Sequence, residues 1–216
     1  MTEADDRPHI LPPIIPVFPL AGAIVLPGGQ LPLNVFEPRY LRMVDDVLGG
    51  ARVIGMIQPR DDARAPELYT VGCAGRLTSF AETGDGRYLI TLTGVSRFRI
   101  REEVDATTPY RQAAVDYSVY AEDADPDDTA QDVDRDSLFE AMMHYLDAEG
   151  ISTDWDAAQE APSDALVNSL AMGCPFAPNE KQALLEARNA SERAQCLMTL
   201  MRMTGGDGAS DGRILQ

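Results

Sequence analysis

The sequence predicts an α+β protein in which a β-rich half, folded as a barrel or sandwich, precedes a small helical bundle. Three observations support this prediction. Short apolar or alternating segments follow one another closely over residues 14–120, and a strongly acidic segment occupies residues 122–136. Beyond it, apolar residues recur at helical spacing. Many short strands separated by Gly and Pro favour a barrel or sandwich over a parallel sheet with crossover helices.

The β-rich half contains eight segments that we expect to be strands: Ile14–Leu20, Ala23–Leu26, Leu31–Phe36, Arg52–Gln58, Thr70–Phe80, Arg87–Thr93, Phe98–Val104 and Arg111–Tyr120. Arg87–Thr93 alternates between apolar and polar residues, which indicates one buried face. Thr78–Glu82 precedes it, and Gly84-Asp85-Gly86 lies between the two. This order predicts a β-hairpin.

One helix interrupts the strands, at Glu37–Leu48. Pro38 stands near the first turn, where its missing N–H costs nothing, and Gly49-Gly50 ends the segment. Its apolar residues recur at helical spacing, so this face is expected to pack on the strands: Leu41, Val44 and Leu48.

The second half contains four expected helices after the acidic segment. The first carries Leu138 to Leu146 and ends near Gly150, and the second is Ser163–Met172. The third begins at Asn179, with Gln182 completing a capping box, and the fourth begins at Ser191. The predicted organisation is a flexible leader (1–13), a β-barrel (14–121), an acidic linker (122–136), a helical bundle (137–204) and a disordered tail (205–216).

Charge and composition disfavour several classes of protein. The net charge is −17, of which residues 121–216 carry −14, and such acidity repels nucleic-acid phosphates. No apolar run is long enough to span a membrane, and the polar, acidic N-terminus is unlike a secretory signal, so we expect a cytoplasmic protein. The three cysteines are sparse and odd in number, which predicts buried thiols in a reducing compartment: Cys73, Cys174 and Cys196.

The residues needed for common catalytic sites are absent from the sequence. The only lysine, Lys181, has no glycine-rich phosphate loop around it, and we expect it to face solvent in the first turn of a helix. No Gly-x-Ser-x-Gly elbow and no metal-binding Cys or His motif occurs. The two histidines are His9, in the leader, and His144, which we expect on a helix surface or in packing. The sequence therefore predicts no enzyme activity, no cofactor and no metal.

Several motifs together resemble the N-terminal domain of Lon proteases. Phe36-Glu37-Pro38-Arg39-Tyr40 is similar to the version in stand-alone bacterial members and in cereblon-type proteins. Gly94–Ile100 is similar to the family's glycine-then-basic-aromatic strand. The remaining segments resemble the start of the domain and its helical subdomain: Ile15–Leu20, Val25–Gly29, Leu31–Leu33, Leu166–Leu170, Glu180–Glu186 and Ser191–Arg193. The resemblance covers about residues 14–203.

This resemblance implies a PUA-like β-barrel followed by a small helical bundle. In Lon this region helps to recognise substrates, while ATP hydrolysis and proteolysis belong to later modules, which we expect to be missing because the chain ends at Gln216. The implied function is a non-catalytic protein- or peptide-binding module in protein quality control, with unfolded or client protein segments as partners. The sequence leaves the oligomeric state open. Two alternatives remain: RNA binding through Arg97, Arg99 and Arg101, and hydrolysis through His144.

If the resemblance extends to function, binding is expected on the barrel surface near two segments: Pro27, Gly28 and Gly29, and then Phe36, Glu37, Arg39 and Tyr40. The first segment is either a tight turn or a mobile lip of a peptide groove. In the second, Phe36 and Tyr40 are either core residues, with Glu37 capping the helix or pairing with Arg39, or part of that groove. The methionines of the second half are bundle core or an adaptable binding face: Met142, Met143, Met172, Met198, Met201 and Met203.

Overall fold

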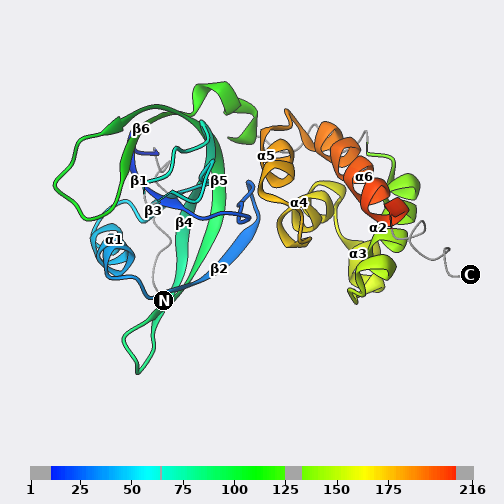
Figure 1. Ribbon diagram of the computed structural model, residues 1–216, viewed down its shortest axis with the longest axis horizontal. Coiled ribbons are helices and arrows are strands. Elements are labelled where there is room, and N and C mark those ends of the chain that lie inside the picture. The colour runs from blue at the N-terminus through cyan, green and yellow to red at the C-terminus, as the bar shows by residue number, and fades with distance from the viewer. Residues whose placement is uncertain (1–10, 64, 125–132, 208–216) are drawn as a thin grey trace, which may run out of the picture.

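The computed structural model describes residues 11–63, 65–124 and 133–207. A β-rich half and a helical half lie side by side (Figure 1). The β-rich half contains β1 (Ile14–Pro19), β2 (Gln30–Val35), α1 (Pro38–Leu48), β3 (Val53–Ile57), β4 (Val71–Glu82), β5 (Tyr88–Val104) and β6 (Gln112–Asp116). The helical half contains α2 (Arg135–Glu149), α3 (Trp155–Glu160), α4 (Ser163–Gly173), α5 (Pro178–Glu186) and α6 (Ala190–Asp207). The α+β class with strands first is as predicted.

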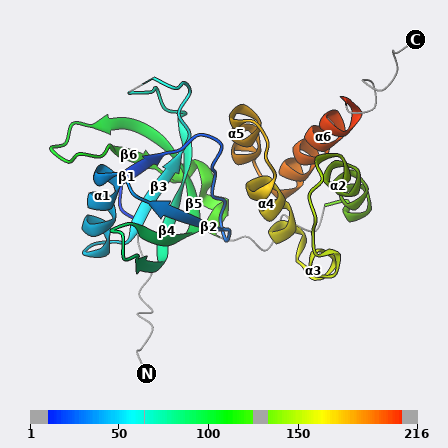
Figure 2. The same cartoon turned by 60° about the horizontal axis from the view of Figure 1, so that its bottom comes forward.

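The six strands form one sheet in the order β2-β5-β4-β3-β1-β6. All neighbours are antiparallel except β1 and β3. The second half of β5 also pairs with β6, from Arg99 opposite Asp116 to Val104 opposite Gln112, so the sheet curls back on itself. β2 lies outside this ring of pairings, alongside the first half of β5 (Figures 1 and 2).

The long strand β5 joins two segments that the sequence separates. Arg87–Thr93 and Phe98–Val104 were predicted as two strands, but Gly94 continues the strand between them. A Cβ at Gly94 would collide with the backbone carbonyl of Leu26, so only glycine allows the two chains to lie this close. Ala23–Leu26, predicted as a strand, is instead a buried connection without regular strand pairing. The predicted hairpin is confirmed as the turn from β4 to β5.

The helices follow the apolar pattern, with differences at their ends. α2 begins after Asp134, whose carboxylate accepts from the Ser137 N–H, and ends at Gly150 in the left-handed conformation. α3 was not predicted, because six residues are too few to show a period. α5 begins one residue earlier than expected. Its capping carboxylate is that of Glu180, which accepts from the Ala177 N–H at 2.8 Å, so the expected capping role of Gln182 is wrong.

The segment expected as an acidic linker is only partly described. Its first residues, Glu122–Ala124, belong to a 3-10 helix, η1 (Ser118–Ala124), that lies against β5. Residues 125–132 lie outside the described residues, as do 1–10 of the expected leader and 208–216 of the expected tail. α6 extends to Asp207, beyond the expected end of the bundle at residue 204.

The two halves are joined by a shared core and by buried amides. One cluster of buried apolar side chains includes residues of both, such as Leu26 and Leu184. Gln58 at the end of β3 is fully buried and donates to the Gln182 side chain at 3.0 Å and to the Pro178 carbonyl at 2.9 Å. Gln182 in turn donates to the Val71 carbonyl at 3.1 Å. These bonds hold α5 against the end of β3 and the start of β4. Within the described ranges, no helix is both long and apolar enough to cross a membrane.

Candidate functional site

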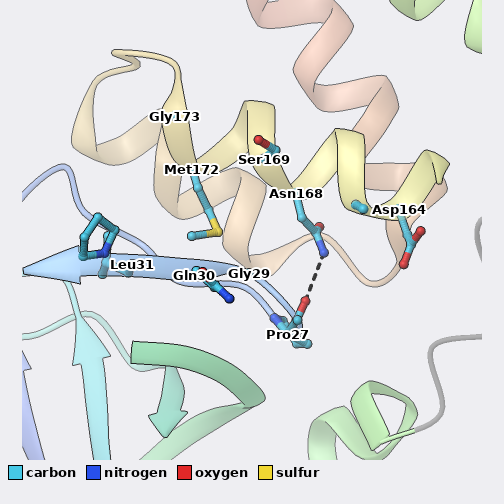
Figure 3. A pocket seen from close by; sticks show the side chains of 12 residues that line it. Pro27, Gly29, Gln30, Leu31, Asp164, Asn168, Ser169, Met172 and Gly173 are labelled. Carbon is cyan, nitrogen blue, oxygen red and sulfur yellow. Dashed lines mark hydrogen bonds between the residues drawn. The ribbon is translucent and has the colours of Figure 1, made fainter. Parts of the chain in front are cut away.

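A groove of about 590 Å³ lies between the start of β2 and α4. The β-side wall is Pro27 to Pro32, and the helical wall comes from α4: Asp164, Ala165, Asn168, Ser169, Met172 and Gly173. Figure 3 shows the Met172 side chain pointing from α4 toward β2. Apolar walls with a few polar groups are typical of ligand sites. We therefore take this groove as the candidate binding site.

Pro27-Gly28-Gly29 lines the groove and is also a tight turn. Gly28 has φ +77°, a conformation that favours glycine. Its N–H donates to the Gly94 carbonyl at 3.0 Å, and the Gly29 N–H donates to the Leu26 carbonyl at 2.9 Å. A Cβ on Gly29 would collide with the Met172 sulfur. The tight-turn interpretation is therefore confirmed, and the interpretation as a mobile lip of a peptide groove stays a prediction.

Asn168 holds the helical wall in place. Its side-chain N–H donates to the Pro27 carbonyl at 3.2 Å, and its amide oxygen accepts from Arg193 Nη1 at 3.0 Å (Figure 3 shows the first bond). Arg193 is buried and also donates to the Leu184 carbonyl at 2.9 Å. Burial lowers the pKa of Arg193 to about 10. Asn168 was not predicted as a site residue, although it lies in a segment that carries the family resemblance.

A buried ion pair lies elsewhere in the contact between the β-rich half and the helical half. Arg97 on β5 contacts Asp123 of η1, with 2.7 Å between Nη2 and Oδ1, and both side chains are nearly inaccessible at 3% and 6% exposure. The guanidinium also donates to the carbonyls of Leu185, in the last turn of α5, and of Ala187 and Arg188, just after its end. It lies over the Tyr120 ring, 4.3 Å from the centroid. One arginine thus connects a strand, the 3-10 helix and the helical half.

The second predicted segment lies away from the groove. Arg39 and Tyr40 line another hollow, of about 560 Å³, whose walls include Pro19, Pro59 and Arg111. Tyr40 is buried, with its ring centroid 4.2 Å from that of Phe18. Glu37 pairs with Arg39 at 2.8 Å. The core interpretation is therefore right for Tyr40, and so is the predicted ion pair.

Phe36 is 62% exposed, so its assignment to the core is wrong. It directly follows β2, whose last residue Val35 is buried. The chain leaves the sheet there, and no helix or strand among the described residues covers the Phe36 ring. The Arg87 guanidinium lies 5.9 Å from its centroid. Pro27–Gly29 and Phe36–Tyr40 therefore stand at opposite ends of one strand rather than in one pocket.

The other candidate groups have structural surroundings. Lys181 is 5% exposed and donates to the Met172 carbonyl at 2.6 Å, so the prediction that it faces solvent is wrong. Burial lowers its pKa. His144 is exposed on α2, as expected for a helix-surface residue, and His9 lies outside the described residues. Arg97 is buried, and Arg101 pairs with Asp116. Arg97, Arg99 and Arg101 therefore do not form a continuous exposed basic surface.

The cysteines and methionines divide between core and surface. Cys73 and Cys174 are buried and Cys196 is half-buried. Met142, Met198 and Met201 belong to the core, whereas Met143 and Met203 are exposed. Met172 is half-buried at the groove. Its position combines the two interpretations of the methionines, because it packs on the core and faces the groove.

Comparison with known proteins identifies the family. The model of the ATP-dependent protease La (LON) substrate-binding domain matches residues 14–203. The chain is 33% identical over 110 residues to Lon protease 2 of Myxococcus xanthus, covering 49% of this chain and 13% of that protein. It is 28% identical over 207 residues to Lon protease 2 of Sorangium cellulosum, covering 87% and 24%. The chain therefore spans about a quarter or less of the length of these curated relatives.

Solved structures agree with the family match. A Lon N-terminal domain protein from Xanthomonas campestris superposes with a TM-score of 0.61 at 22% identity, covering 86% of this chain and 97% of that one. The N-terminal domain of a Mycobacterium avium complex Lon protease gives a TM-score of 0.60 at 15% identity, covering 90% and 98%. These likenesses show a shared fold, and the family match covers most of the chain. The chain therefore belongs to the family of Lon substrate-binding domains.

Proposed function

We propose that this chain is a non-catalytic module that binds unfolded segments of client proteins in the groove between β2 and α4. The single observation that carries the proposal is this groove, apolar and open between two walls that buried hydrogen bonds hold in place. Membership of a substrate-binding family supports it. Binding many different unfolded segments requires apolar surface that tolerates varied side chains, and a methionine wall provides such surface.

The proposal extends to fold and cellular context. We propose that the curled sheet is a PUA-like β-barrel, which the pairing of β6 with both β1 and β5 supports. We also propose that the protein works in the cytoplasm, in protein quality control. RNA binding is not favoured, because Arg97 is buried in an ion pair with Asp123 and because the net charge of the chain is −17. Hydrolysis through His144 is not favoured either, because that side chain lies on an exposed helix face away from the groove.

The test measures binding of one client protein in two states, unfolded and native. Fluorescein-labelled lactalbumin that has been reduced and alkylated with iodoacetamide, which adds no charge to its cysteines, serves as the unfolded client, and the native labelled protein serves as the folded control. We expect anisotropy to rise with the unfolded form alone. Met172→Glu should weaken binding at least about tenfold, because it places a carboxylate in the apolar wall and a factor of ten needs only ~1.4 kcal/mol.

The matched control is Met203→Glu, the same change on an exposed methionine of α6. It should bind the unfolded client like the unchanged protein. Melting temperatures of both variants must stay close to that of the unchanged protein for the comparison to count. Equal affinity of the two folded variants would place the site away from this groove, and no binding of unfolded lactalbumin would refute the proposed function.

A further inference from the structure

β2 has a free edge along its whole length. Within the described residues it pairs on one side alone, with β5, in a register from Gln30 opposite Thr93 to Val35 opposite Tyr88. The other side carries no strand. An unpaired edge presents a row of N–H and C=O groups to whatever approaches it. The chemistry that satisfies such a row is the main chain of another extended segment.

The pairing identifies which groups face outward. The Gly94 N–H donates to the Gly29 carbonyl at 2.8 Å, and these two residues continue the register of the β2–β5 pair. Directly bonded pairs recur at every second residue of an antiparallel ladder. Leu31, Leu33 and Val35 therefore bond to β5, and the alternate residues point their main-chain groups away from the sheet: Gln30, Pro32 and Asn34.

Pro32 fits this assignment. Proline has no N–H to donate, and within sheets it is tolerated on edge strands with its nitrogen turned away from the ladder. The outward groups are thus the N–H and C=O of Gln30, the C=O of Pro32, and the N–H and C=O of Asn34. A row with one donor missing still offers two donors and three acceptors to a short peptide.

The groove and the free edge are continuous. Gln30, Leu31 and Pro32 form part of the groove wall. Figure 3 shows the start of β2 lying opposite α4. Beyond α4 the edge continues to Val35 and the exposed ring of Phe36. At about 3.3 Å per residue, the six residues of β2 span about 20 Å. One extended segment of about six residues would therefore run alongside the whole of β2, from Gln30 to Val35.

We propose that a client peptide binds by adding to the free edge of β2 as an extra strand, with its first part enclosed by α4. This inference rests on the proposed function, since it specifies how the groove holds its client. The main chain of the peptide pairs with Gln30, Pro32 and Asn34. Its side chains contact Met172 at one end and Phe36 at the other. Recognition through the main chain explains how one site would accept many sequences.

Charge complementarity selects the kind of peptide. Among the described residues that line the groove, Asp164 is the only charged one, and the whole chain has a net charge of −17. A segment with apolar and basic residues is attracted to such a surface, and an acidic one is repelled. A second copy of this chain is disfavoured as the occupant, because two chains of −17 repel each other and Pro32 weakens pairing between two such edges.

The first experiment follows individual amides by NMR hydrogen exchange, with the unfolded lactalbumin probe. In the free protein the amides of Gln30 and Asn34 should exchange fast and those of Leu31, Leu33 and Val35 slowly. Saturating probe should slow Gln30 and Asn34 at least about tenfold. If the same amides instead become protected as the protein alone is concentrated, the edge pairs with a second copy and the proposal is wrong.

The second experiment removes one outward donor. Asn34→Pro deletes an N–H that does not bond to β5, and Asn34→Ala keeps that N–H while removing the same side chain. We expect Asn34→Pro to weaken probe binding by about three- to tenfold relative to Asn34→Ala, the loss expected for one hydrogen bond. Melting temperatures establish whether both variants fold. If Asn34→Pro does not fold, the amide exchange of the unchanged protein alone decides whether the peptide adds to β2 as a strand.

The outcomes separate this inference from the proposed function. Probe binding that needs Met172, together with protected edge amides and a weakened Asn34→Pro variant, supports both. Probe binding that needs Met172 without amide protection overturns strand addition and leaves the groove as a client site. If the unfolded probe does not bind at all, the proposed function fails and the inference fails with it.

Discussion

At Gly94 the backbone of β5 passes so close to Leu26 that a side chain has no room. The nearest atom to a Cβ there would be the Leu26 carbonyl oxygen, which is main chain and cannot rotate away. The same residue bonds to both Gly28 and Gly29. A single glycine in the middle of a strand therefore determines where the groove turn sits.

Gly94→Ala should lower the free energy of unfolding by about 2–3 kcal/mol, the upper part of the range for overpacking, because backbone must shift. Gly84→Ala is the matched control: it lies in the hairpin turn with no atom near a new Cβ, and should change stability by less than about 0.5 kcal/mol. Urea denaturation measures both. Equal stability of the two variants would mean that the backbone at Leu26 shifts to make room without a loss of stability.

Among the elements, η1 is held to β5 by one buried ion pair. Breaking a buried pair leaves the remaining charge without a partner, whereas an exposed pair contributes little. Arg97 and Asp123 are buried, while the side chain of Arg101, which is on the same strand as Arg97 and pairs with Asp116 of β6, is 67% exposed. The two arginines stand four residues apart on β5, so they provide an internal comparison.

Arg97→Gln should lower the free energy of unfolding by about 3–5 kcal/mol, and Arg101→Gln by at most about 1 kcal/mol. The first change also removes the donors to three carbonyls in and just after the last turn of α5. We therefore expect Arg97→Gln to weaken client binding as well, by loosening the helical wall of the groove. Chemical denaturation together with the anisotropy measurement tests this. Similar losses for both arginines would contradict the role of burial.

Across the whole molecule, several buried groups resist ionisation at high pH. Burial raises the pKa of the Cys73 thiol from 9.0 to about 12. Burial also raises the pKa values of Tyr117 and Tyr145 from 10.0 to about 12. The folded protein keeps these protons while the unfolded chain releases them. The stability that they contribute is therefore complete below about pH 9 and is lost as pH rises toward 12.

We expect the free energy of unfolding to decline steadily between about pH 9 and pH 11, beginning with the thiol. Cys73→Ala removes one of two buried thiols, while Cys174, whose pKa burial raises to about 11, still contributes from about pH 9, so the decline of the variant should be shallower between about pH 9 and pH 10. Urea denaturation at steps of about one pH unit tests both. Parallel declines in the two proteins would show that the buried thiol makes no contribution.

The predicted boundary between the halves remains a prediction. Residues 125–132 lie outside the described part of the chain, so the expected linker is tested only at its edges. The acidic composition predicted a solvated segment, but the Asp123 carboxylate is buried and pairs with Arg97. We still expect an Asp-directed protease to cut first within 122–136, and first cuts within Arg87–Ile100 would show that the division is wrong.

Local patterns predicted much of the fold, because strand alternation and helical spacing are short-range signals. The hairpin, α1 and four of the five later helices follow from them. The groove could not be predicted as a whole, since it joins residues 27–32 to α4, more than a hundred positions later. Phe36 and Lys181 were misplaced for the same reason: burial depends on partners that periodicity does not reveal.

The burial of Lys181 has a practical chemical consequence. It is the only lysine in the sequence, and its amine is directed at the Met172 carbonyl at the end of α4. Reagents that acylate amines therefore have one side-chain target in this protein, and they reach it only when the contact between α4 and α5 opens. The rate of acylation at Lys181 thus reports how often the helical wall of the groove moves. An engineered probe is unnecessary, because the natural sequence already carries a single-site reporter.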